Sequence, residues 1–221
     1  MRRVLVILTL LISSLSLRAE EVNVSEILFG HIGDSYGWHI TEFNGNHVII
    51  PLPCIVRSST GWHFLMSSKL EHGHEYEGLF IAEEGRYADK IVERGPDGEY
   101  IRPFDISITK NVASLMFSSA LLVLLVLLSA RWYRRHDASE EAPDGIAAAL
   151  EPLIMVVNEE LIKENVGPDY KRYSPYLLTV FFFILLNNLL GIVPFFPGGA
   201  NVTGNIAVTM VLALCTFIAV N

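Results

Sequence analysis

Apolar and polar positions divide the chain into long apolar runs separated by polar segments. Residues 112–130 carry no charged side chain, and a helix of that length rises about 28 Å, close to the thickness of a bilayer core. A second run covers 175–193, and a third begins near residue 205 and is still apolar at Asn221. The pattern predicts membrane spans over 112–130, 175–193 and 205–221. The third advances only about 24 Å, so we expect it to be incomplete and the sequence to be truncated.

Basic flanks orient these spans. Residues 131–135 contain three arginines and directly follow the first span, and Lys171 and Arg172 precede the second. Because basic residues accumulate on the cytoplasmic side, we expect the segment between the two spans to be cytoplasmic. The Pro- and Gly-rich residues 194–199 then form an external turn.

The N-terminus is typical of a secreted or membrane-inserted chain. Two arginines at positions 2 and 3 precede an apolar stretch over 4–17, and Ala19 precedes a polar segment. This pattern predicts a signal peptide over 1–19, with an uncleaved anchor helix as the alternative. In both cases we expect residues 20–107 on the extracytoplasmic (periplasmic) side of the inner (plasma) membrane, in a multi-pass protein.

Residues 31–66 show a pattern typical of β-structure. The Asn-Gly-Asn turn signal at 44–46 precedes a strand-like run over 47–53. Two similar pieces, 37–40 and 61–64, flank this run and could be paired strands. A further turn, Gly-Pro-Asp-Gly, occupies 95–98. We therefore expect a small antiparallel domain within residues 20–107.

Between the first two spans, apolar residues recur at helical spacing. Intervals of 4, 3, 4 and 4 separate Ile146, Leu150, Leu153, Val157 and Leu161. This predicts an amphipathic helix over 145–166, ended by Gly167-Pro168, with its apolar face at the membrane interface or against a partner helix. Pro152 is compatible with that helix only if the helix begins or kinks there.

Composition and charge agree with a chain that is part aqueous and part membrane. Hydrophobic residues make up 51% and charged residues 18%, against roughly 25% charged in typical globular chains. The net charge of −8 argues against a nucleic-acid partner. Residues 20–105 hold 15 acidic and 6 basic side chains, whereas residues 173–221 hold no Asp, Glu, Lys, Arg or His. The predicted fold class is a membrane all-α protein, made of transmembrane helices and an interfacial amphipathic helix over 108–221, with a small acidic β-rich extracytoplasmic N-terminal region.

Catalytic and metal-binding motifs are weak. The densest histidine cluster, Glu-His-Gly-His-Glu at 71–75, is more typical of a solvated acidic loop than of a metal site. Cys54 and Cys215 fall in different environments, external and intramembrane, so we expect no disulfide between them. The sequence contains no phosphate-binding loop and no serine-elbow motif, and it points to no cofactor, metal or enzymatic activity.

Polar residues inside the apolar runs carry more information. The candidates for an ion pathway are Asn188, Thr203, Asn205 and Thr209, and Asn187 precedes the first of them. An amide within a membrane seeks either a partner on another helix or water. These residues therefore form hydrogen bonds between helices or line an aqueous pathway. Asn188 and Asn205, both within about two helical turns of the external turn at 194–199, are the pair that we expect to reach water from the outside.

Three features of the membrane part form a distinctive combination. They are Tyr176 to Val193 followed by Pro194, Asn188 three residues before Gly191, and the run Thr-Gly-Asn-Ile-Ala-Val-Thr-Met-Val-Leu-Ala-Leu at 203–214. This combination resembles subunit a of the F-type ATP synthase. The resemblance covers roughly 104–221, including the amphipathic segment. The acidic external region resembles the N-terminal extension of this subunit in some Bacteroidetes-like bacteria.

The resemblance implies a non-catalytic, ion-translocating subunit in the membrane sector of the synthase. In this family, subunit a forms two half-channels beside a rotating ring of c subunits, and protons or sodium ions pass through them to drive ATP synthesis. Further implied partners are the b subunit, the other synthase subunits and membrane lipid. The family's essential arginine lies on a later helix, so we expect it beyond Asn221. The arginines of this chain nearest the spans are interfacial flanks: Arg131, Arg134, Arg135 and Arg172.

The alternative function is a membrane-anchored extracytoplasmic binding or assembly protein with no transport role. In that case the helices only anchor residues 20–107. A further helix that carries an arginine beyond Asn221 would favour the synthase subunit.

Overall fold

The computed structural model describes residues 33–43, 46–193 and 196–220. The chain divides into two units, Met1–Gly33 and Asp34–Asn221, and the second holds all of the helices and strands described below. The predicted signal peptide over 1–19, its anchor-helix alternative and the turn residues 44–45 lie outside the described residues.

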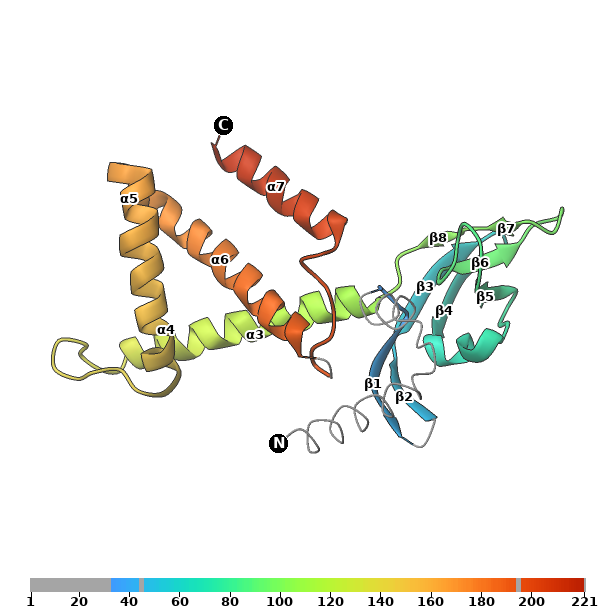
Figure 1. Cartoon of the computed structure of the whole chain (residues 1–221), viewed down its shortest axis with the longest axis horizontal. Coiled ribbons are helices and arrows are strands. Elements are labelled where there is room, and N and C mark those ends of the chain that lie inside the picture. Colours follow the sequence, from blue (N-terminus) through green and yellow to red (C-terminus); the bar gives the residue numbers. More distant parts are fainter. Residues whose placement is uncertain (1–32, 44–45, 194–195, 221) are drawn as a thin grey trace, which may run out of the picture. The chain divides into compact units, whose positions relative to one another are not determined.

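The first half of the second unit is β-rich, as predicted (Figure 1). Two consecutive hairpins open it: β1 (Gly37–Phe43) pairs with β2 (Asn46–Pro51), and β3 (Pro53–Ser58) pairs with β4 (Gly61–Met66), all antiparallel. The flanking pieces 37–40 and 61–64 are therefore strands, but they do not pair with each other: 37–40 pairs with 49–51 of the central run, and 61–64 pairs with 55–58, just beyond it.

A second antiparallel sheet follows in the order β5 (Leu79–Ile81), β6 (Ile91–Arg94), β7 (Tyr100–Ile101). Short 3₁₀ turns, η2 (Ser67–Lys69) and η3 (Glu71–Gly73), connect it to β4. The predicted turn at 95–98 joins β6 to β7, where the Gly95 N–H donates to the Glu99 carbonyl at 2.8 Å and Gly98 has a φ of 79°. Only glycine adopts that backbone conformation without strain.

The β-rich region has its own small core. Alternation along β3 buries Cys54 and Val56 and leaves Pro53 and Arg57 exposed. The buried cluster consists of Tyr36, Cys54, Val56, Leu65, Leu70, Leu79 and Ile91. Burying each Val, Leu or Ile side chain contributes about 1.5–3 kcal/mol to the free energy of folding. This cluster therefore stabilises the short β-rich region.

β8 (Phe104–Asp105) connects this core to the helices. It pairs with β3, and the chain continues beside β3 because the Ile106 N–H donates to the Ile55 carbonyl and the Ile108 N–H to the Pro53 carbonyl, both at 3.0 Å. The sheet thus leads directly into the first long helix.

The second half is helical. Its long helices are α3 (Lys110–Tyr133) and α6 (Tyr170–Ile192), and a shorter apolar helix, α7 (Ile206–Val220), follows (Figure 1). Two helical segments among the described residues are long and apolar enough to cross a membrane, 110–133 and the continuous helical stretch 145–192, whose most apolar part is α6. Helix α3 extends the expected span 112–130 at both ends, and α6 begins five residues before the expected start at Pro175.

The expected amphipathic helix over 145–166 is helical throughout but not uniformly α. It consists of α4 (Gly145–Met155), a π-helical stretch, η4 (Val156–Ile162), and α5 (Lys163–Val166), and it ends at Gly167 with a φ of 77°. The turn η5 (Gly167–Asp169) then leads into α6. The helix neither starts nor stops at Pro152, which lies inside α4.

The π-helical stretch changes which residues share a face. Pro152 has no N–H to donate, and the wider i→i+5 turns follow four residues later. A π-turn places residues five apart on one side, and Val157 and Ile162 are both buried. Leu153 and Leu161, expected on the same stripe as Val157, are exposed. The prediction that these apolar residues share one face at a constant helical spacing was therefore wrong.

Candidate functional site

Two adjacent asparagines on α6 make different contacts. Asn187 is 2% exposed, and its Oδ1 accepts a hydrogen bond from Ser118 Oγ of α3 at 2.9 Å. Its Nδ2 donates to the Phe183 carbonyl one turn earlier at 2.8 Å. Successive residues on a helix point about 100° apart, so Asn188 lies on another face, where it is exposed.

The Asn187 contact is a packing contact between helices. Ser114 and Ser118 are four residues apart on α3 and both are fully buried. Small side chains at that spacing let two helices approach closely, and a buried amide then joins them through a hydrogen bond. Asn187 and Ser118 therefore hold α3 against α6.

Asn188 is bonded to the segment that precedes α7. Its Oδ1 accepts a hydrogen bond from Thr203 Oγ1 at 2.7 Å, and Thr203 is half-buried. Asn188 itself remains exposed despite this contact. In a membrane, an exposed amide at such a position needs water or a partner subunit.

The loop between α6 and α7 folds back onto the end of α6. The Gly199 N–H donates to the Leu190 carbonyl at 3.2 Å, and Ala200 and Val202 are 2% and 1% exposed. Asn201 Oδ1 accepts a hydrogen bond from the Gly204 N–H at 3.0 Å. This packing fixes the backbone on both sides of Thr203.

The other two pathway candidates form local hydrogen bonds. Asn205 precedes α7, and its Oδ1 accepts from the Ala207 N–H at 2.9 Å, as a helix N-cap does. Thr209 Oγ1 donates to carbonyls of its own helix, Ile206 at 3.1 Å and Asn205 at 3.3 Å. Of the four candidates, the structure joins Asn188 and Thr203 by a hydrogen bond, whereas the side chains of Asn205 and Thr209 bond to backbone groups at the start of α7.

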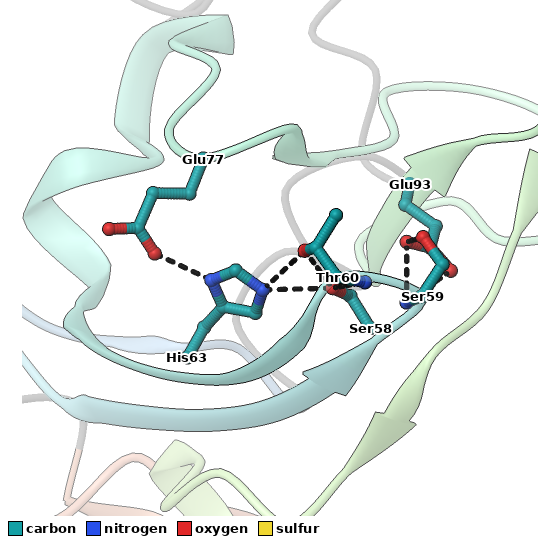
Figure 2. A network of polar contacts seen from close by, with 6 residues as sticks. All are labelled: Ser58, Ser59, Thr60, His63, Glu77 and Glu93. Atoms are coloured by element: carbon teal, nitrogen blue, oxygen red, sulfur yellow. Dashed lines mark hydrogen bonds and ion pairs between the residues drawn. The ribbon is translucent and has the colours of Figure 1, made fainter.

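A separate polar cluster lies at the β3–β4 turn (Figure 2). His63 Nδ1 lies 2.5 Å from Glu77 Oε2, and its Nε2 lies 2.8 Å from Ser58 Oγ and 2.9 Å from Thr60 Oγ1. This places a carboxylate, an imidazole and a hydroxyl in the order found in serine hydrolases. No local motif in the sequence links these three residues, so the pattern of the chain did not predict the cluster.

Its contacts indicate a structural role for this cluster. Ser58 Oγ also accepts the Thr60 N–H at 3.1 Å, so the hydroxyl is part of the turn. Glu93 accepts two hydrogen bonds from Ser59, one from its N–H and one from its Oγ at 2.7 Å. The hydrogen bond with His63 lowers the pKa of the Glu77 carboxyl group below its usual value. The cluster therefore fastens the β3–β4 turn to the segments that carry Glu77 and Glu93.

The remaining sequence features are the histidine-rich loop at 71–75 and the two cysteines. Within 33–43, 46–193 and 196–220, no group of three or more His, Cys, Asp or Glu side chains is arranged to hold a metal. His74 is exposed. Cys54 and Cys215 are both free thiols, buried and exposed respectively, and burial raises the pKa of Cys54 to about 11.

Comparison with known proteins divides the chain at about the start of α3. Residues 115–221 match the family described as ATP synthase A chain, and residues 27–111 match a domain family of unknown function (DUF8433). The match to the domain family of unknown function ends at residue 111, just after the β-rich region. No solved structure matches the chain.

Several curated proteins are similar to the chain. ATP synthase subunit a 2 of Prosthecochloris aestuarii is 40% identical over 166 residues, which cover 70% of this chain and 48% of the relative. ATP synthase subunit a of Chlorobium phaeobacteroides is 43% identical over 66% of this chain and 43% of the relative. The corresponding protein of Myxococcus xanthus is 44% identical over 61% and 43%. The chain thus spans less than half the length of these relatives, and the similarity extends N-terminally beyond residue 115.

Proposed function

We propose that this chain, whose residues 115–221 belong to the ATP synthase A chain family, is the N-terminal portion of the ion-translocating subunit a. In this proposal residues 108–221 form part of the half-channels beside the c ring, and the b subunit and other synthase subunits are the remaining partners. The chain has no catalytic role of its own. The alternative, an anchored extracytoplasmic protein without transport, finds no support in these similarities.

The topology of the proposal follows from the charge pattern. Residues 131–172 lie in the cytoplasm, and the β-rich region 20–107 and the α6–α7 loop lie outside the inner membrane, after a signal peptide over 1–19. Asn188 is four residues from the C-terminal end of α6, about 6 Å along the helix axis. In this topology the Asn188–Thr203 pair is near the external surface.

The observation that carries the site assignment is the contrast between the two asparagines. Asn187 is enclosed between α3 and α6, whereas Asn188 is exposed and bonded to a hydroxyl of the external loop. A polar pair at the external end of an apolar helix can reach water through a polar cleft. We therefore assign Asn188 and Thr203 to the external half-channel, with Asn205 and Thr209 in its vicinity.

The test is proton flux through the complete synthase in membrane vesicles. Asn188→Leu should lower flux by on the order of tenfold, the effect of about 1.4 kcal/mol on the barrier, with normal assembly. Asn187→Leu is the matched control. It makes the same substitution at the neighbouring residue, but the contact that it removes is the hydrogen bond with Ser118 on α3. We expect that variant to lower assembly, by the roughly 0.6 kcal/mol typical of such hydrogen bonds, rather than flux per assembled complex. Normal flux with reduced assembly in Asn188→Leu would make this residue a packing contact.

A further inference from the structure

A short segment at the start of the β-rich region contacts the first turn of α3. Asp34 Oδ1 accepts a hydrogen bond from the Asn111 N–H at 3.0 Å, and the Ser35 carbonyl accepts one from the Lys110 N–H at 2.8 Å. The first N–H groups of a helix have no partner within the helix, so these contacts cap α3. The segment beginning at Asp34 is thereby fixed to α3.

Three residues after Ser35, Trp38 contacts the α6–α7 loop. The Trp38 side chain is 4% exposed, and its Nε1–H donates to the Gly198 carbonyl at 3.1 Å. Its ring packs edge-on against Phe196 with 5.0 Å between centroids. Phe196 also lies 6.5 Å from the ring of Phe117 on α3. One buried indole thus joins β1 to a loop that is 160 residues away in sequence.

The loop segment that Trp38 contacts is packed closely against the end of α6, so a contact that holds Gly198 also restrains the residues next to it. A Cβ atom on Gly198 would lie 2.5 Å from the carbonyl oxygens of both Leu190 and Val193. Gly199 is bonded to Leu190, and four residues later Thr203 is bonded to Asn188, two residues before Leu190. The contacts run from Trp38 through Gly198 to the end of α6, where the polar pair lies.

We propose that Trp38 is a positioning residue for the Asn188–Thr203 pair. By holding Gly198 and Phe196, the β-rich region fixes the α6–α7 loop so that Thr203 stays within hydrogen-bond distance of Asn188. The β-rich region is therefore a part of the external half-channel's scaffold. This inference rests on the function proposed above for the Asn188–Thr203 pair.

The chain contains a matched control for Trp38. The tripeptide Gly-Trp-His occurs at 37–39 and again at 61–63, in each case at the start of a strand. Trp62 is 50% exposed and packs against Phe64 and Phe104 within the β-rich region. Trp38→Phe and Trp62→Phe make the same chemical change, but only the first removes a hydrogen bond to the loop.

The first experiment measures release of the loop. Ala200 is 2% exposed, so Ala200→Cys, in a background with Cys54→Ala, should react slowly with a membrane-impermeant maleimide added from outside. Trp38→Phe should accelerate that labelling about fivefold or more, because the loop opens locally more often. Trp62→Phe should leave the rate unchanged. Equal rates in the two phenylalanine variants would overturn the inference.

The second experiment is a double-mutant cycle on proton flux in the complete synthase. Trp38→Phe should lower flux about threefold alone but less than about 1.5-fold when Asn188→Leu is already present, because both changes act through one pair. Full additivity of the two losses, or no loss in Trp38→Phe, would contradict a positioning role. Normal flux in Asn188→Leu would instead refute the proposed pathway, and the labelling result would still decide whether Trp38 holds the loop.

Discussion

Asn187 and Asn188 are adjacent in α6, yet one is buried in a helix–helix contact and the other is exposed. Asn187 and Asn188 have the same side chain and nearly the same depth, yet one is 2% exposed and bonded to Ser118 and the other is exposed and bonded to Thr203. The difference is the rotation of about 100° per residue along an α-helix. A substitution at one position should therefore have a consequence that the same substitution at its neighbour lacks.

Cys54 gives a pH-dependent prediction at the same scale. Burial raises the pKa of its thiol to about 11. The thiolate is the reactive form, so well under about 1% of Cys54 is reactive at neutral pH. We expect alkylation by iodoacetamide to be at least about a hundredfold slower than at the exposed Ser139→Cys, and to rise about tenfold per pH unit up to pH 10. Mass spectrometry of the purified protein measures both rates, and equal rates at pH 7.5 would contradict the buried position of Cys54.

The sequence alone identified Asn188 and Thr203 as polar residues in an apolar context, but it favoured Asn205 as the companion of Asn188, and the structure bonds Asn188 to Thr203 instead. Their pairing depends on how the loop folds back on α6, and the partner of Asn187, Ser118, is 69 residues away. Asn205 and Thr209 have the same residue types and the same apolar surroundings, and they are bonded within the first turn of α7. Residue type in a single sequence does not distinguish these outcomes, because a local carbonyl or N–H competes equally well for the hydrogen bond.

Among the elements, the α6–α7 loop depends on a small residue at one position. A Cβ on Gly198 would meet the backbone carbonyls of Leu190 and Val193 and the Cβ of Val193 at 2.5–2.6 Å. A Cβ on Gly191 would have its nearest contact, the Ala200 carbonyl oxygen, at 3.5 Å. Neither glycine has a positive φ, so the difference between them is steric.

The matched pair Gly198→Ala and Gly191→Ala tests this packing. Overpacking costs about 1–3 kcal/mol, which for a chain of this length corresponds to a Tm lower by roughly 2–12 °C. We expect that decrease in Gly198→Ala and a change within about 2 °C in Gly191→Ala, measured by thermal unfolding of the purified complete subunit in detergent. A Gly198→Ala variant as stable as Gly191→Ala would mean that the loop is not packed on α6 in the protein.

The elements differ in how far their sequence pattern specifies them. The hairpins β1–β2 and β3–β4 follow from strand-like runs separated by turn residues, and local pairing of neighbouring strands is the simplest outcome. The π-helical stretch at 156–162 was not predicted, because the apolar positions fit a constant α-helical interval and Pro152 gave the only sign of irregularity. After a proline, the backbone N–H groups can bond to carbonyls four or five residues earlier. Which of the two patterns forms depends on packing that the sequence pattern does not contain.

Across the whole chain, two independent expectations meet in one contact. The acidic β-rich region was expected outside the membrane from the N-terminal pattern, and the α6–α7 loop from the basic flanks of the spans. The hydrogen bond between Trp38 and Gly198 requires the two regions to be on the same side. The proposed topology satisfies that requirement, and it places Asn188 at the external end of α6.

The most direct test is side-specific labelling at position 188 in the complete synthase. Asn188→Cys should react with a small impermeant thiol reagent added from outside, whereas Asn187→Cys should react at least about tenfold more slowly because that position is enclosed between helices. Ser139→Cys serves as the reference for the opposite side, and it should react only when the cytoplasmic face is accessible. Labelling of Asn188→Cys from the outside, with concurrent loss of proton flux, is the result that we predict. An unreactive Asn188→Cys, or one labelled only from the cytoplasmic side, would contradict the assignment of this pair to the external half-channel.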